Sequence, residues 1–128
     1  MDLLKKIISL ENEAAEFGFQ WETTTQIMEQ IQSECAEVTE HLQAENCDKS
    51  LLQEEIGDLL HAAFSLCVFC QLDPQETLQQ SLEKFERRLQ AVKIIAKEKQ
   101  LTHLKGLSFD ELMTIWGQAK KRADLSNT

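Results

Sequence analysis

The sequence predicts an all-α protein of about five helices. Its 128 residues include one Pro, four Gly and no Tyr, so residues that interrupt helices are scarce, and so are the aromatic residues that favour strands. Apolar residues recur at spacings of three and four along most of the chain, which is typical of helices with one buried face. The length suits one core, and we expect residues 1–128 to form a single domain.

Capping residues set the helix boundaries. Gly18 is a natural stop for the first helix, and Asp48 is a suitable N-cap for the third. The segment Asp-Pro-Gln-Glu at 73–76 opens the fourth helix, and Ser108 with Glu111 forms a capping box for the last. Residues 126–128 are expected to be a frayed tail. The five expected helices cover residues 2–17, 22–45, 48–72, 74–100 and 108–121.

The second and fourth helices each have a clear core stripe, whereas the third helix of the chain is apolar around most of its circumference. Four neighbouring helices in a chain of this size do not comfortably cover so much apolar surface. We therefore expect the bundle to be completed by a homodimer or a higher homo-oligomer. The expected stripes are Ile27, Ile31, Cys35, Val38 and Leu42 on the second helix, and Leu78, Leu82, Phe85, Leu89, Val92 and Ala96 on the fourth.

The charge balance limits the partners. A formal net charge of −9 argues against nucleic acid or an anionic membrane as the main partner, because both favour clustered Lys and Arg. No apolar run reaches the roughly 20 residues that span a bilayer, and acidic residues lie where a signal peptide would be cleaved. We expect a soluble cytoplasmic protein.

The four cysteines lack the spacing of a disulfide framework, and we expect buried free thiols. A metal or redox CxxC at Cys67 and Cys70 is the alternative, but no second CxxC or HxxxH completes a zinc site.

Two pairs of acidic residues are the strongest functional pattern. Glu34 and Glu37 stand one turn apart on the second helix, and Glu55 and Asp58 do so on the third, so the two pairs can face each other. Glu34 lies at the border of the apolar stripe of its helix, whereas Glu55 falls inside the apolar arc of its own, which is an unusual place for a carboxylate. We therefore expect Glu55 to be the carboxylate most embedded in apolar surroundings.

An unpaired buried carboxylate is normally neutralised by a cation or a metal. No Lys or Arg occurs at positions 28–47 or 50–83, apart from Lys49 at the edge. Hard oxygen ligands suit Mg²⁺, or Mn²⁺, better than Zn²⁺. The alternative is that the acids only form a solvated helix face.

Basic and aromatic residues with helical spacing follow this pattern. Lys84 and Arg88 stand four residues apart on the fourth helix, as do Trp116 and Lys120 on the last. Basic groups beside an acidic metal site favour a phosphate ligand, although Lys84 could instead pair with solvent or Glu83, and Trp116 could belong to the core. His61 lies near Asp58 but is more typical of a half-buried helix residue, and we leave it out of the site.

The ordered segments GFQW, SECAEV, EEIGDLL, EKFERR and ELMTIWGQAKK resemble the MazG family of nucleoside triphosphate pyrophosphohydrolases, in particular the C-terminal module of its two-domain bacterial members. The likeness runs from about residue 18 to residue 121. It implies an all-α dimer or higher assembly that hydrolyses nucleoside triphosphates to monophosphate and pyrophosphate. Many members have a further acid where this chain has Ser33, which bears on metal number or affinity. The resemblance implies Mg²⁺ ligands at Glu34, Glu37, Glu55 and Asp58, and nucleotide contacts at Lys84, Arg88, Trp116 and Lys120.

Two other functions remain open on the sequence. A di-metal carboxylate bundle normally carries Glu-x-x-His on two helices, and this chain has no such motif. A noncatalytic acidic helical bundle for protein interactions is the other alternative.

Overall fold

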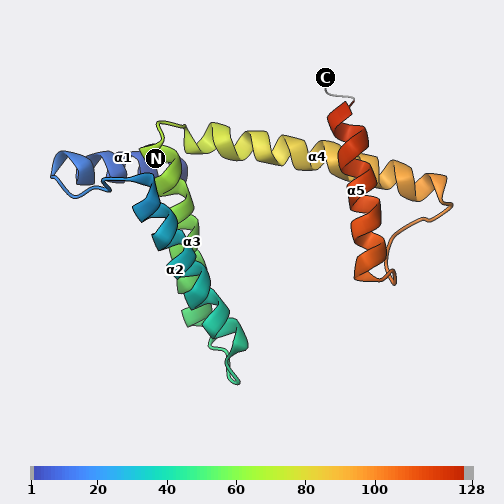
Figure 1. Ribbon diagram of the computed structural model, residues 1–128, viewed down its shortest axis with the longest axis horizontal. Helices are drawn as coiled ribbons and strands as arrows, with labels where there is room; N and C mark the ends of the chain where they lie inside the picture. Colours follow the sequence, from blue (N-terminus) through green and yellow to red (C-terminus); the bar gives the residue numbers. More distant parts are fainter. Residues whose placement is uncertain (1, 126–128) are drawn as a thin grey trace. The chain divides into compact units, whose positions relative to one another are not determined.

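The computed structural model describes residues 2–125, which form five α-helices and no strand (Figure 1). This confirms the predicted all-α fold. The predicted frayed tail at 126–128 lies outside the described residues. The helices are α1 (Leu3–Glu16), α2 (Thr24–Gln43), α3 (Lys49–Phe69), α4 (Pro74–Glu98) and α5 (Phe109–Leu125).

Side chains cap the helix starts as predicted. Asp48 accepts backbone N–H bonds from the first turn of α3, the shorter at 2.9 Å. Asp73 accepts a hydrogen bond of 2.9 Å from a backbone N–H group in the first turn of α4, whose first residue is Pro74. Ser108 and Glu111 bond to each other's backbone N–H groups in the predicted capping box. These starts are local features, which explains why the sequence predicted them.

The ends of α3 and α4 come earlier than predicted. Gly18 has a φ of 95° and follows α1, as expected. However, α3 ends at Phe69 and α4 at Glu98, because Gln71 and Gln100 take positive φ values of 61° and 62°. In both cases the chain closes with the paired backbone bonds of a Schellman turn. Glutamine rarely fills this position, so the sequence did not mark either stop.

The chain divides into two compact units, Met1–Thr77 and Leu78–Thr128. In the first unit, α3 packs along α2 and also contacts α1 (Figure 1). Ile27 of α2 and Leu52 of α3 are buried there. Since a short connection joins α2 and α3, the two helices run antiparallel, which brings Glu34 and Glu37 of α2 close to Glu55 of α3.

The second unit is built on small side chains. Ala91 and Ile95 of α4 pack with Ile115, Ala119 and Ala123 of α5, and all five are buried. Because Ala123 belongs to this core, α5 continues to Leu125 rather than ending at residue 121 as predicted. Two ion pairs, Arg88 with Asp124 and Arg122 with Glu98, join the same helices.

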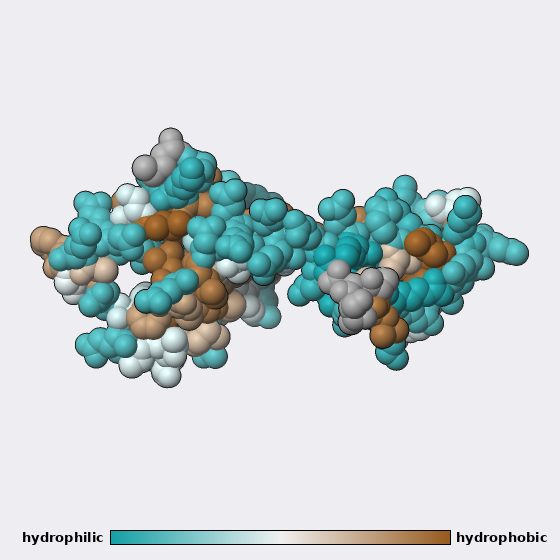
Figure 2. Space-filling model, turned by 90° about the horizontal axis from the view of Figure 1, so that it is seen from above, coloured by the Kyte–Doolittle hydropathy of each residue, from teal (hydrophilic) through white to brown (hydrophobic). Residues whose placement is uncertain are grey.

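The expected apolar stripes are only partly covered. Ile27 and Ala96 are buried as predicted, but much of the remaining stripe is exposed, and both units show apolar surface among hydrophilic side chains (Figure 2). The cysteines are free, as expected, but they are half-buried or exposed rather than buried. The exposed apolar residues of α3 and α4 include Leu51, Ile56, Leu60, Leu78, Leu82 and Phe85.

Among the described residues, no single helix is long and apolar enough to cross a membrane. Only α3 and α4 counted together reach that length and composition.

Candidate functional site

The facing surfaces of α2 and α3 hold a cluster of carboxylates. Glu34 and Glu37 extend from α2, and Glu55 extends from α3. One oxygen from each of the three lies within 4.8 Å of the other two. The structure thus brings together three of the four acids that the sequence pattern singled out.

Glu34 is the most buried member of the cluster, with 9% of its surface exposed. Its Oε1 accepts a hydrogen bond of 2.6 Å from the Gln30 amide, while its buried Oε2 has no hydrogen-bond partner among the described residues. The helix pattern predicts that Glu55, not Glu34, is the carboxylate most embedded in apolar surroundings. That prediction is wrong because Glu34 lies where α2 meets both α3 and the wall of a cavity.

Glu55 is half-buried, with 22% of its side chain exposed. Its Oε1 lies 3.8 Å from His41 Nε2, and its buried Oε2 has no hydrogen-bond partner within the described chain. Two buried carboxylate oxygens without donors, one on each helix, leave negative charge that the described side chains do not neutralise.

Glu37 is exposed, and its neighbours perturb its titration. Glu55 raises the pKa of Glu37 above its ordinary value of 4.5, first because the two carboxyl groups can share a proton and then by charge repulsion. Loss of hydration and the charge of Asp58 raise this pKa further, whereas a hydrogen bond with Glu34 lowers it. Glu37 therefore binds a proton more readily than an isolated glutamate does.

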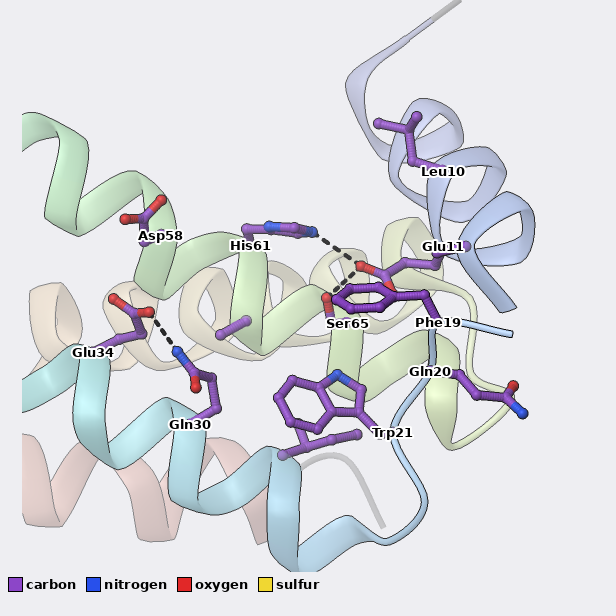
Figure 3. A pocket seen from close by; sticks show the side chains of 13 residues that line it. Leu10, Glu11, Phe19, Gln20, Trp21, Gln30, Glu34, Asp58, His61 and Ser65 are labelled. Atoms are coloured by element: carbon purple, nitrogen blue, oxygen red, sulfur yellow. Dashed lines mark hydrogen bonds and ion pairs between the residues drawn. The ribbon is translucent and has the colours of Figure 1, made fainter. Parts of the chain in front are cut away.

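Asp58 stands apart from this three-membered cluster. It is exposed on α3 and lines a cavity together with Glu34, and Figure 3 shows the two carboxylates at the same end of that cavity. Its place as a fourth metal ligand remains a prediction.

The four predicted nucleotide contacts lie in the second unit. Arg88 is half-buried, and its guanidinium lies 6.0 Å from the ring centre of Trp116. The same guanidinium donates a hydrogen bond of 3.2 Å to the Asp124 carboxylate. Trp116 also contacts the Phe85 ring at 6.0 Å and packs against the core. Lys84 and Lys120 are exposed and form no ion pair among the described residues.

Sequence reasoning missed several polar neighbours of the site. Gln30 lies four residues before Glu34 on the same helix face, so its spacing could have indicated the contact. His61, which we left out, lies 2.9 Å from Glu11, and Ser65 donates to the same carboxylate at 2.6 Å. Glu11 lies 54 positions before Ser65 in the chain, and no local sequence pattern connects it to α3.

The geometry defines a class of protein: an all-α chain whose paired antiparallel helices hold a carboxylate cluster suited to a hard divalent cation. The family model described as the MazG nucleotide pyrophosphohydrolase domain matches residues 22–93, more than half of the chain. The chain belongs to this family. The match includes all four acids as well as Lys84 and Arg88, whereas Trp116 and Lys120 lie beyond it.

Two relatives carry the name nucleoside triphosphate pyrophosphohydrolase. The chain is 29% identical to the Escherichia coli (strain K12) protein over 119 residues, which cover 93% of the chain and 45% of that relative. It is also 29% identical to a Thermotoga maritima protein named nucleoside triphosphate pyrophosphohydrolase/pyrophosphatase MazG. That match runs over 111 residues, which cover 87% of the chain and 41% of the relative. The chain spans less than half the length of these relatives.

The raised pKa of Glu37 predicts how the metal-free protein responds to pH. In the unfolded chain Glu37 titrates near 4.5, and in the folded protein it titrates higher, so its stabilising contribution is complete below pH 4.5 and is lost as pH rises through the folded pKa. Glu37→Gln removes this pH-dependent loss of stability, because the amide does not ionise. With a chelator present, urea unfolding should show the variant gaining stability over wild type as pH rises from 4.5 to above neutral.

Glu40→Gln, at an exposed position of α2, is the control and should run parallel to wild type. If Glu37→Gln also ran parallel to wild type, Glu37 and Glu55 would not share a proton in the folded protein.

Proposed function

We propose that this protein hydrolyses nucleoside triphosphates to nucleoside monophosphate and pyrophosphate, with Mg²⁺ as its metal and Mn²⁺ as a possible substitute. The observation that carries the proposal is the cluster of Glu34, Glu37 and Glu55, with its two buried oxygens that lack donors. Family membership and the names of the relatives support the same chemistry.

The donor set fits the proposed metal. All the candidate ligands, Glu34, Glu37, Glu55 and Asp58, offer carboxylate oxygens, which Mg²⁺ and Mn²⁺ prefer. A cation would supply the missing partner of the buried oxygens on both helices. When bound, the metal supplies a Lewis acid that polarises a phosphoryl oxygen and lowers the pKa of water.

The chain's own groups would then bind and orient the triphosphate. Carboxylates alone repel an anionic substrate, so Lys84, Arg88 and Lys120 are our proposed phosphate contacts. In the described structure Trp116 touches the Arg88 guanidinium, which favours a role in holding that cation in place. Asp124 also accepts a hydrogen bond from this guanidinium.

A noncatalytic acidic bundle accounts less well for these observations. Acids that only solvate a helix face are exposed, as Glu29, Glu40 and Glu54 are here. Glu34 is buried, and a purely structural role gives no reason to retain its unpartnered oxygen.

Analysis of the reaction products tests the proposal. Chromatography of a nucleotide digest, without added inorganic pyrophosphatase, should give monophosphate and pyrophosphate in equal amounts. Glu55→Gln should abolish turnover, because it removes a charged oxygen from the cluster while preserving shape, and Glu54→Gln at the adjacent exposed position should not. Accumulation of diphosphate and orthophosphate, or near wild-type activity of Glu55→Gln at saturating Mg²⁺, would overturn it.

We also propose that the protein is a homodimer or a larger homo-oligomer. Leu60 on α3 is 55% exposed and Phe85 on α4 is 53% exposed, so both units leave large apolar side chains uncovered. A second copy of the chain would bury such surface.

Light scattering should give at least twice the chain mass of 14.7 kDa. Leu60→Glu should shift the population toward monomer, because it places a charge within the apolar face. Gln90→Glu adds the same charge at an exposed polar position of α4, away from the face that carries Phe85, and should leave the mass unchanged. A wild-type monomer at micromolar concentration would contradict this proposal.

A further inference from the structure

A cavity of about 540 Å³ lies in the first unit, between α1, the segment after it, α2 and α3. Glu34 and Asp58 lie at one end, beside the carboxylate cluster (Figure 3). Glu11, His61 and Ser65 lie at the other end. The walls between the two ends are mostly apolar or aromatic, and they include Ala14, Phe19, Trp21, Ile27 and Ala62.

The far end of this cavity holds a carboxylate in a fixed position. Glu11 Oε1 accepts a bond of 2.6 Å from the buried Ser65 hydroxyl. His61 Nε2 lies 2.9 Å from the same oxygen, so its N–H donates there as well. Both bonds go to Oε1, which leaves Oε2 without a hydrogen-bond partner among the described residues. A ligand entering the cavity therefore meets a positioned, unused acceptor.

The cavity suits the nucleoside part of a nucleotide. Its volume lies in the range of small-molecule sites, and its walls offer aromatic faces at Trp21 and Phe19 on which a flat base can stack. Its opposite end adjoins the acids where we propose that the metal and the phosphates bind. A nucleotide placed along the cavity would have its base at the Glu11 end.

We propose that this cavity binds the nucleoside and that Glu11 selects bases carrying an exocyclic amino group; the inference rests on the proposed nucleotide hydrolysis. At the edge of the base that would face Glu11, adenine and cytosine present the N–H donor of their exocyclic amino group. Hypoxanthine and uracil present a carbonyl oxygen at the same position. Two facing acceptors have no hydrogen to share, and the bonds from Ser65 and His61 oppose a shift of the carboxylate toward the neighbouring ring N–H, so Glu11 disfavours these bases.

Matched substrate pairs test the selection. The pairs CTP with UTP and ATP with ITP differ at the amino position, so each pair controls for base size. In wild type, kcat/KM should favour the amino-bearing member by roughly tenfold to a hundredfold, the range for a hydrogen bond to a charged group. Ratios near one, or a preference for UTP and ITP, would overturn the inference without any variant.

Glu11→Gln isolates the contributing group. The amide keeps the shape of the side chain but can rotate to donate or accept, so both ratios should fall toward one. Glu13→Gln, exposed on the same helix and outside this cavity, is the matched control and should keep the wild-type ratios. Unchanged ratios in Glu11→Gln would contradict the assignment of Glu11.

A binding measurement separates this inference from the proposed hydrolysis. The indole N–H signal of Trp21, assigned with Trp21→Phe, should shift on titration with CMP, and UMP should bind at least about tenfold more weakly. If these shifts occur but no triphosphate is hydrolysed, the proposed function fails and the inference stands. If triphosphates are hydrolysed but CMP and UMP bind equally, the inference fails and the proposed function stands.

Discussion

Neutralisation of the carboxylates between α2 and α3 is the constraint on which the structure depends. Glu34, Glu37 and Glu55 converge although no Lys or Arg forms an ion pair with any of them among the described residues. Burying such charge without a partner costs several kcal/mol, so the helices can approach only if a proton or a cation compensates. Glu55 raises the pKa of Glu37, so a proton on Glu37 is favoured by the same crowding of acids. The same need for a cation links the packing of the helix pair to its proposed chemistry.

Most of the fold could be predicted from the sequence because its signals are local. Asp48, Asp73 and Ser108 cap the turns that follow them, and each bond spans only a few residues. The ends of α3 and α4 could not be predicted, because Gln71 and Gln100 take a left-handed conformation that their residue type does not favour. Backbone hydrogen bonds, and not the residue type, end these two helices.

The candidate site was predictable only where helix spacing determines it. Pairs one turn apart on each helix placed Glu34, Glu37 and Glu55 in the right neighbourhood. Their relative burial depends on how α2 meets α3, and rotation angles within one helix cannot give this, which explains why Glu55 was wrongly ranked above Glu34. The contact of Glu11 with α3 joins distant parts of the chain and leaves no mark on either local pattern.

Binding of Mn²⁺, followed by electron paramagnetic resonance without nucleotide, tests most directly whether a divalent cation compensates the cluster. The wild-type protein should bind the ion with a defined stoichiometry. Glu34→Gln should weaken binding by about tenfold or more, because it removes the charge of the most buried candidate ligand. Glu29→Gln, at an exposed position of α2, should bind as wild type does. Equal affinity in wild type and Glu34→Gln would contradict the account, since the buried carboxylate would then serve no cation.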